Sequence, residues 1–392
     1  MSDLQETIRL FDENSHLSRF EAQVVSCERV EGGYAVVLDR TAFFPLGGGQ
    51  QPDTGTLAYA RVYDVREKNR VITHYIDKPL CPGAHVRGEI DWEQRFRRMQ
   101  NHSGEHIVSG LVHAKYGYDN VGFHMGSEDV TIDFSGELTR EQIDEIETLA
   151  NEVVWRNVPV TARYPDPEEL KTLDYRAKLE LTENVRIVTV EGVDDCACCA
   201  PHVSRTGEIG AIRLLDFIRY KGGVRIHMLC GADAMEEDRR KAAAVRHISN
   251  LLSVKQADTA KAVDALSAQL EETRRSLSAL EKQTARLLAE NAVPENGVTL
   301  LFTDSLSMDA LREFANCAAP KAKLAAGFSG SDTGGWNYIL ESETLDLKAL
   351  APAINAGLSG RGGGSARMIQ GRASGTQEKI RAFLENAGFL ND

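Results

Sequence analysis

The 392-residue sequence lacks any segment that could direct it into or across a membrane. Its first twenty residues contain no basic stretch followed by an apolar stretch. No apolar run elsewhere approaches the ~18 residues of a membrane span. We therefore expect a cytoplasmic protein with no membrane partner.

The sequence is also short of positive charge. It has 45 Lys and Arg against 58 Asp and Glu, which gives a formal net charge of −13. Because phosphate affinity rests mainly on Lys and Arg, this balance argues against a general nucleic-acid binder, and no DNA partner is expected. Any RNA contact must be local. The candidate basic patches are Arg95, Arg97 and Arg98; Arg219, Lys221 and Arg225; and Arg361, Arg367 and Arg372.

Cysteines are few and unevenly spread. There are seven, an odd number, and three of them lie between Cys196 and Cys199. Adjacent or next-but-one cysteines are poor disulfide partners. In a reducing compartment such a cluster indicates metal binding or catalysis.

The hydrophobic pattern predicts an α+β fold. Residues 21–91 carry short β-type runs separated by Gly, Pro and Asp, as in a small sheet or barrel. Residues 91–233 mix helix and strand without βαβ regularity, which favours a two-layer α/β domain. We expect boundaries near residues 90, 233 and 292, giving an N-terminal β-rich domain (1–90), a metal-binding domain (91–233), a helical segment (234–292) and a C-terminal α/β domain (293–392).

Residues 234–292 contain no Pro or Gly and are rich in helix-forming residues. Apolar residues and threonines step by three and four in alternation, which indicates a coiled-coil seam and a homodimer. The alternative is a single amphipathic helix lying on the body of the protein. The stretch LLSVKQADT, with Ser253 or Asp258 as a cap, could interrupt the helix. The seam consists of Val263, Leu266, Leu270, Thr273, Leu277, Leu280, Thr284 and Leu287.

Two pairs of potential metal ligands share one spacing. His102 and His106 are four apart in a predicted helix, so both imidazoles leave the same face. Cys198 and His202 are again four apart, and zinc favours a thiolate with imidazoles. The pairs together predict one bound Zn²⁺ per chain. The alternative is that the cysteines are packing residues and the histidines bind backbone carbonyls.

Cys198 is preferred among the three clustered thiols because it repeats the spacing of the histidine pair. Cys196 could replace it or lie in an outer shell, and Cys199 is expected to point away. The HExxH pattern of metallopeptidases is absent, and Glu105 is expected to project off the metal face, which argues against a zinc peptidase. The cytidine-deaminase pattern is absent as well.

Two glycine clusters stand out. Gly47, Gly48 and Gly49 lie in FFPLGGGQQPDTG, and Gly362, Gly363 and Gly364 lie in GRGGGSARMIQG. Three consecutive glycines do not favour a strand, so they indicate close backbone approach or an unusual turn. No acidic residue occurs from Asn355 to Thr376, so arginines spaced through this second cluster suit RNA contact. The alternative is a flexible loop.

These motifs, in this order, resemble the editing domain of alanyl-tRNA synthetases and the free-standing alanyl-tRNA editing proteins of the long AlaX type. RTAFFPLGGGQQPDTG resembles the family's Thr-x-Phe and Gly-Gly-Gln segment, NHSGEH its His-x-x-x-His helix, and CCAPHVSRTGEIG its Cys-x-x-x-His-Val segment. GRGGGSARMIQG is similar to part of the C-terminal domain of the synthetases. The resemblance extends from Thr41 to Gly371.

The resemblance implies roles for individual residues. His102, His106, Cys198 and His202 fall on zinc-ligand positions, and Thr41 and Gln50 fall on positions that face the misacylated amino acid. Thr41 would bind a serine hydroxyl. The residues implied in tRNA contact are Arg361, Gly362, Gly363, Gly364, Arg367 and Gln370, and Gln50 with Gly47, Gly48 and Gly49 would supply oxyanion or ribose donors.

The implied activity is deacylation of mischarged tRNA(Ala), with Ser-tRNA(Ala) expected first and Gly-tRNA(Ala) second. Aminoacylation domains are missing, so we expect action in trans. One departure is that CCAPH replaces the family's Cys-Gly-Gly-Thr-His, which leaves the accepted amino acid open. Two alternatives are a non-catalytic tRNA-binding adaptor with structural zinc and, less favoured because no Asp-His-His string occurs, a hydrolase related to phosphoesterases.

Overall fold

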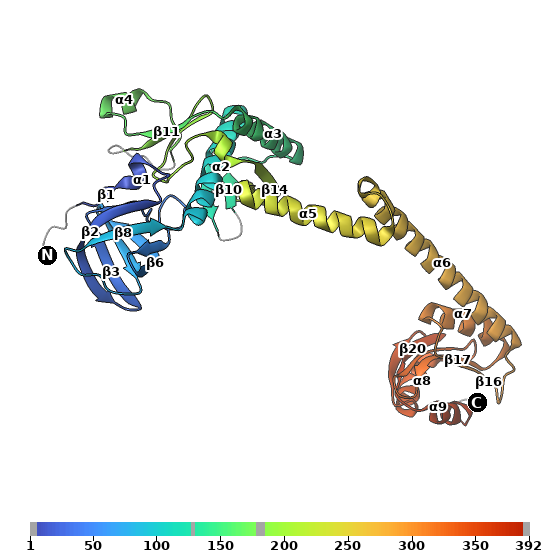
Figure 1. Cartoon of the computed structure of the whole chain (residues 1–392). Coiled ribbons are helices and arrows are strands. Elements are labelled where there is room, and N and C mark those ends of the chain that lie inside the picture. Colours follow the sequence, from blue (N-terminus) through green and yellow to red (C-terminus); the bar gives the residue numbers. More distant parts are fainter. Residues whose placement is uncertain (1–5, 127–129, 178–184, 387–392) are drawn as a thin grey trace. The chain divides into compact units, whose positions relative to one another are not determined.

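The computed structural model describes residues 6–126, 130–177 and 185–386. It divides into two compact units, Met1–Ala244 and Val245–Asp392 (Figure 1). Helices and sheets occur in both units, which confirms the α+β class. None of the described helices is long and apolar enough to cross a membrane.

A six-stranded closed barrel forms the first part of the first unit. Its strands follow the order β2-β3-β7-β6-β5-β8. Alternate side chains point inward, as in β8, and bury a core that includes Val24, Leu38, Val62 and Ile76. The bounds are β2 (Arg19–Val30), β3 (Gly33–Leu38), β5 (Gly55–Leu57), β6 (Ala60–Lys68), β7 (Val71–Ile76) and β8 (His85–Ile90). A short pair, β1 (Ile8–Arg9) with β4 (Arg40–Thr41), and helix α1 (Leu10–Glu13) accompany it.

The second part of this unit is built around helix α2 (Trp92–Tyr116). Asp91 caps its first turn by accepting from the Gln94 N–H, and Gly117 ends it with φ 69°. Helix α3 (Arg140–Arg156) begins with a capping box formed by Thr139 and Gln142. Because α2 is buried along most of its length, its polar side chains, among them His102, Glu105 and His106, lie in the interior of the unit.

Two sheets complete the first unit. One has the order β14-β15-β10-β9 and the other β11-β12-β13. Strand β13 contains Cys196 and leads directly to Cys198 and Cys199. The bounds are β9 (Asn120–Met125), β10 (Val130–Phe134), β14 (Ile212–Tyr220), β15 (Gly223–Cys230), β11 (Val160–Arg163), β12 (Ile187–Val190) and β13 (Asp194–Ala197), with α4 (Pro167–Thr172) and η1 (Thr206–Ile209) between them.

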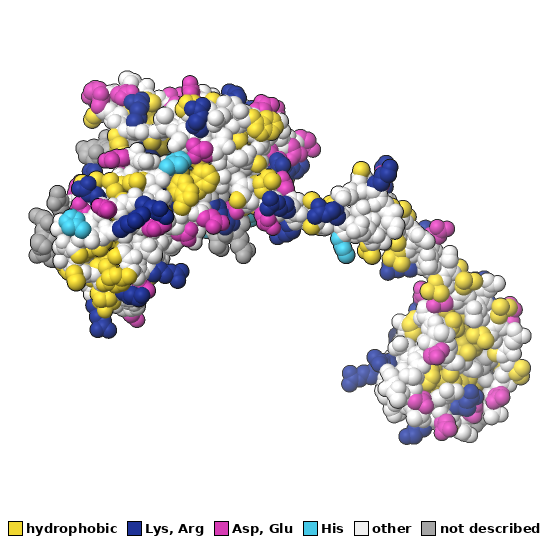
Figure 2. Space-filling view, viewed as in Figure 1, with side chains coloured by type: hydrophobic (Ala, Val, Ile, Leu, Met, Phe, Trp, Pro, Cys, Tyr) yellow, Lys and Arg dark blue, Asp and Glu magenta, His cyan; other side chains and the backbone are white. Residues whose placement is uncertain are grey.

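The predicted interruption of the long helical segment is confirmed. Helix α5 (Gly231–Leu252) ends before Ser253, whose φ is 55°, and η2 (Gln256–Asp258) precedes helix α6 (Thr259–Asn291). Asp258 holds the N-cap position of α6 but makes no side-chain capping hydrogen bond. Apolar side chains of the predicted seam are exposed, such as Leu266 at 53% and Leu280 at 61%, and Figure 2 shows apolar and charged patches at the surface of α6.

A five-stranded sheet of order β16-β17-β18-β20-β19 forms the body of the second unit. The glycine run Gly362–Gly364 lies in its edge strand β19, so the flexible-loop alternative is wrong. The bounds are β16 (Val298–Thr303), β17 (Leu324–Ser331), β18 (Gly335–Glu341), β19 (Arg361–Gly364) and β20 (Met368–Ala373), with α7 (Met308–Ala318), η3 (Ala319–Lys321), α8 (Leu347–Gly357) and α9 (Gln377–Glu385).

Candidate metal centre

The structure brings the two predicted ligand pairs together. His102 and His106 leave one face of α2, and Cys198 and His202 lie just after β13. One donor atom from each lies within 4.8 Å of the others. The Nε2 atoms of His102 and His202 are 3.5 and 3.4 Å from Cys198 Sγ. These four residues could hold one metal ion.

The electrostatic environment favours a thiolate at Cys198. Burial alone would raise the pKa of this thiol, but electrostatic interaction with His102 and hydrogen bonds from His102 and His106 outweigh it. The pKa of Cys198 is therefore held well below its ordinary value. Burial lowers the pKa of His202 to about 3, so this imidazole is neutral. A thiolate and a neutral imidazole are the protonation states that bind metal.

Polar partners occupy the second nitrogen of the histidines. His102 Nδ1 lies 3.0 Å from Gln50 Oε1, and His202 Nδ1 lies 3.0 Å from Ser103 Oγ. A carboxamide oxygen only accepts, so Gln50 places the proton of His102 on Nδ1 and leaves Nε2 as the ligand atom. Such outer partners are usual in metal sites. The residues present therefore fit a metal ion bound through Nε2.

The first glycine cluster forms a turn against this site. Gly48 and Gly49 have φ of 58° and 78°. A Cβ on Gly49 would lie 2.8 Å from the carbonyl oxygen of Phe123, and the Met125 N–H donates to the Gly49 carbonyl at 3.2 Å. Glycine is therefore required at position 49 by both backbone conformation and space. Gln50 follows, fully buried, and its Nε2 has no protein partner among the residues that the structure describes.

A cavity of about 460 Å³ is lined by three of the four donors, His102, His106 and Cys198. Its lining includes Gly48, His102, His106, Phe123, Cys198 and Cys199. Cys199 is not one of the four donors, yet its Sγ lies 3.5 Å from where a Cβ on Gly48 would stand. The altered segment beside the last ligand thus places a thiol in the cavity wall.

Glu105 does not project off the metal face, contrary to the sequence-based expectation. Ser109 Oγ donates to its Oε1 at 2.6 Å, and Asn120 Nδ2 donates to the same oxygen. These buried partners draw the carboxylate inward, where its Oε2 is 3.9 Å from His106 Nε2, and Glu105 lines the cavity.

Thr41 lies in the barrel core rather than in this cavity. Its Oγ1 is 2.8 Å from His74 Nε2 and accepts from the Phe43 N–H at 3.1 Å. The side chain is fully buried. The substrate role of Thr41 stays a prediction. His74 was not singled out from the sequence, although it stands at an inward position of the alternating run RVITHYI.

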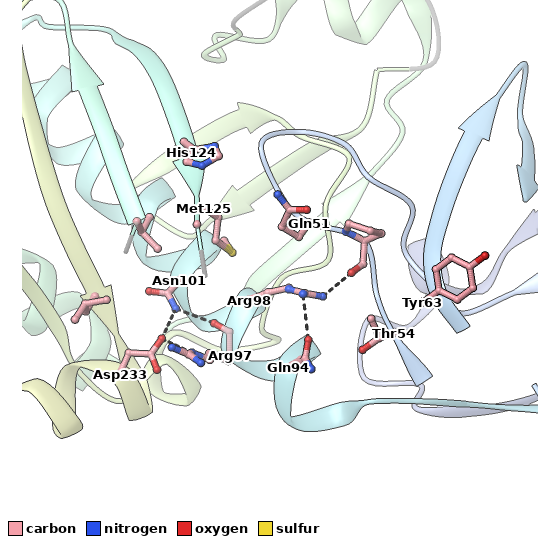
Figure 3. A pocket seen from close by; sticks show the side chains of 14 residues that line it. Gln51, Thr54, Tyr63, Gln94, Arg97, Arg98, Asn101, His124, Met125 and Asp233 are labelled. Carbon is pink, nitrogen blue, oxygen red and sulfur yellow. Dashed lines mark hydrogen bonds and ion pairs between the residues drawn. The ribbon is translucent and has the colours of Figure 1, made fainter. Parts of the chain in front are cut away.

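The basic group around Arg95 is not a surface patch. Arg95 is fully buried and donates to the Asp53 carboxylate and to the Ser15 carbonyl. Arg97 and Arg98 line a separate cavity of about 800 Å³. Figure 3 shows Arg97 beside Asp233, with which it pairs, and Arg98 reaching toward Gln94. The prediction of an RNA-contacting patch at Arg95 is therefore wrong.

The C-terminal candidate residues fall on two neighbouring strands, β19 and β20, except Arg367, which lies in the connection between them. Arg361 stands opposite Arg372, and Gly362 opposite Gly371. Arg361 is exposed and has no ion pair within the described ranges, whereas Arg367 pairs with Glu341 and Glu343. Gln370 accepts from Arg312 at 2.8 Å. Among these residues, Arg361 is the better placed for an external anion.

Comparisons with known proteins point to one family. The model of the threonyl and alanyl tRNA synthetase second additional domain matches residues 185–240, which include Cys198 and His202. The alanine–tRNA ligase of Ignicoccus hospitalis is 32% identical over 321 residues, covering 78% of this chain and 35% of the ligase. The alanyl-tRNA editing protein Aarsd1 of Rattus norvegicus is 26% identical over 407 residues, covering 96% of this chain and 97% of that protein.

The chain spans 35% and 40% of the length of the first two ligases that it matches, those of Ignicoccus hospitalis and Halorubrum lacusprofundi. The solved C-Ala domain of Aquifex aeolicus alanyl-tRNA synthetase covers 26% of this chain and 99% of its own, with 18% identity and a TM-score of 0.22. That score is too low to establish a common fold.

Proposed function

We propose that this chain, a relative of the alanyl-tRNA editing proteins as its motifs predicted, is a zinc-dependent deacylase that hydrolyses the ester bond of mischarged tRNA(Ala). The observation that carries the proposal is the buried set of three histidines and one thiol at a cavity beside a glycine turn. The relatives supply the substrate class. Ser-tRNA(Ala) is the expected substrate and Gly-tRNA(Ala) the second.

His102, His106, Cys198 and His202 would hold the zinc ion. When bound, zinc supplies a Lewis acid that polarises the ester carbonyl or lowers the pKa of a water molecule. Gln50 positions His102 through Oε1. Its buried Nε2 is then available to donate to the oxygen that becomes negatively charged, together with backbone N–H groups of Gly48 and Gly49.

Serine is the expected target because an alanine pocket rejects an added hydroxyl by only about 100-fold. A second hydrolytic site corrects this error. For Thr41 to recognise the serine hydroxyl, its own hydroxyl must give up the hydrogen bond with His74 and form one with the substrate. Cys199 stands in the cavity wall where the family has glycine, so it is a further candidate contact for the amino acid.

We assign tRNA binding to the exposed edge formed by Arg361 and the glycines of β19. Glycine allows close approach of a phosphate or base, and an unpaired guanidinium supplies charge. Arg367 and Gln370 are already engaged within the chain and should contribute less. The exposed seam of α6 would pair with a second copy of the chain to form a homodimer.

The second candidate is a tRNA-binding adaptor with structural zinc. The observation that favours it is the number of protein donors, because four protein ligands usually close a structural zinc site. The two functions differ in catalysis, because a deacylase hydrolyses the aminoacyl ester whereas an adaptor binds the tRNA and leaves the ester intact.

Incubation with Ser-tRNA(Ala) and Ala-tRNA(Ala), before and after chelation and zinc return, tests the proposal. A deacylase consumes Ser-tRNA(Ala) selectively, stops on chelation and recovers with zinc. Equal persistence of both substrates with intact tRNA binding would establish the adaptor instead.

A further inference from the structure

The three histidines of the candidate centre differ in what holds their second nitrogen. His102 and His202 meet neutral partners, Gln50 and Ser103. His106 Nδ1 makes no hydrogen bond among the described residues and instead lies 3.4 Å from a carboxylate oxygen, Asp194 Oδ2, at ion-pair distance. The Asp194 and His106 side chains are each 2% exposed, so this is a contact between two buried side chains.

Asp194 is itself fixed by a two-pronged ion pair. Arg176 Nε lies 2.6 Å from Oδ1, and Arg176 Nη2 lies 2.8 Å from Oδ2. The backbone of Arg176 is held beside β13, because its N–H donates to the Asp195 carbonyl at 2.8 Å and its carbonyl accepts from the Ala197 N–H at 2.9 Å. These backbone hydrogen bonds therefore hold Arg176 where its guanidinium can contact Asp194.

This pair accounts for an ionised carboxylate at the site. A buried carboxylate without a partner is unfavourable, and a bidentate guanidinium compensates its charge with well-directed hydrogen bonds. An ionised Asp194 accepts only, so it favours the proton of His106 on Nδ1. His106 Nε2 is then left as the ligand atom.

A second reading makes Asp194 a metal ligand. His106, Asp194 and Cys196 also form a group whose donor atoms lie within 4.8 Å of one another. Both oxygens of Asp194, however, already accept from Arg176. A cation bound there would have to displace this buried guanidinium and compete for His106, so the geometry favours a supporting role.

We infer that Asp194, held by Arg176, is a positioning residue that fixes the tautomer and ring orientation of His106 for metal binding. This inference rests on the proposed zinc site. Loss of such an outer partner typically weakens metal affinity ~10–100-fold. Asp194→Asn, which retains shape but lacks the negative charge, should weaken zinc affinity by this factor.

The test is equilibrium competition for zinc between the full-length chain and a chromogenic chelator. Asp195→Asn is the matched control, because Asp195 is the next residue of β13 and bonds Thr189 rather than a histidine. Arg176→Lys keeps the charge but loses the two-pronged contact, so it should weaken affinity in the same direction. The double variant with Asp194→Asn and Arg176→Lys should bind zinc only slightly more weakly than Asp194→Asn alone. The absorption bands of bound Co²⁺ should shift in Asp194→Asn and Arg176→Lys but not in Asp195→Asn.

The outcomes separate this inference from the proposed function. Tight zinc binding by the natural chain with unchanged affinity and Co²⁺ spectrum in Asp194→Asn overturns the positioning role and leaves the deacylase standing. Two zinc ions per natural chain, with one lost in Asp194→Asn, would make Asp194 a ligand and also overturn it. If Asp194→Asn does not fold, Arg176→Lys decides alone, and natural affinity in that variant overturns the inference. A natural chain that binds no zinc overturns both proposals.

Discussion

The two runs of three glycines use the same residues for different physical purposes. In Gly47–Gly49, positions 48 and 49 take positive φ, and the turn packs against the strand that carries Phe123. In Gly362–Gly364 the backbone is an edge strand without positive φ. There a Cβ on Gly362 would lie 2.0 Å from Tyr338 Oη, while one on Gly363 would meet nothing within 4 Å. The first run closes a buried site, and the second presents an open edge.

A run of glycines in a sequence indicates that the backbone needs glycine there, but it does not indicate whether conformation or space is the reason. Conformation and space both require glycine at position 49, space alone requires it at position 362, and neither requires it at position 363. The two regions should therefore respond differently to the same substitution.

The largest expected contrast is between Gly49→Ala and Gly363→Ala. Strain at positive φ and the contact with the Phe123 carbonyl should lower the free energy of unfolding by about 2–4 kcal/mol in Gly49→Ala. Gly363→Ala should change it by less than about 0.5 kcal/mol. Denaturant unfolding followed by hydrogen exchange of each unit measures both. Equal losses in the two variants would break the comparison.

Acid should lower the stability of the first unit, which contains Gly47–Gly49, and leave the stability of the second unit unchanged. Burial lowers the pKa of His74 to about 4 from 6.5, so the unfolded chain takes up a proton before the folded one does. The contribution of His74 to the stability of the first unit should then be fully present above pH 6.5 and be lost, by about 3 kcal/mol, as the pH drops to 4. Hydrogen exchange at pH 7, 5.5 and 4.5 tests this, with His74→Gln as the variant that should reduce the pH dependence, leaving the part that comes from His202.

The second unit supplies the internal control for that experiment. His247 is the only histidine of residues 245–392, and it is exposed. A fall of equal size in the exchange protection of both units would rule out His74 as the cause.

The smallest expected effect concerns the open edge. Arg361→Ala should weaken tRNA(Ala) binding by at most about 3 kcal/mol. It should also reduce the slope of log affinity against log salt concentration by about 1. Arg367→Ala should do less, because Arg367 is shared between Glu341 and Glu343. Binding titrations at three salt concentrations measure both variants. A larger loss in Arg367→Ala would reverse the assignment of the contact.

The sequence predicted the four donors that the structure brings together and the helix that carries two of them, because four-residue spacing places side chains on one helical face. Their role as metal ligands stays a prediction. It also located the break between α5 and α6. It did not reveal the partners Ser103, Asp194 and His74, because contacts between strands and helices distant in sequence leave no local pattern. The burial of Arg95 was missed for the same reason, since its partner Asp53 lies 42 residues away. Whether Thr41 touches substrate, and whether α6 pairs between chains, stay predictions.

The central claim is that the zinc held by His102, His106, Cys198 and His202 performs the deacylation. The most direct test measures zinc content and single-turnover hydrolysis of Ser-tRNA(Ala) in Cys198→Ala, with Cys317→Ala as the control because that thiol lies in the second unit. We predict that Cys198→Ala loses zinc and hydrolysis together while Cys317→Ala keeps both. Natural rates of hydrolysis in a zinc-free, folded Cys198→Ala would contradict the claim.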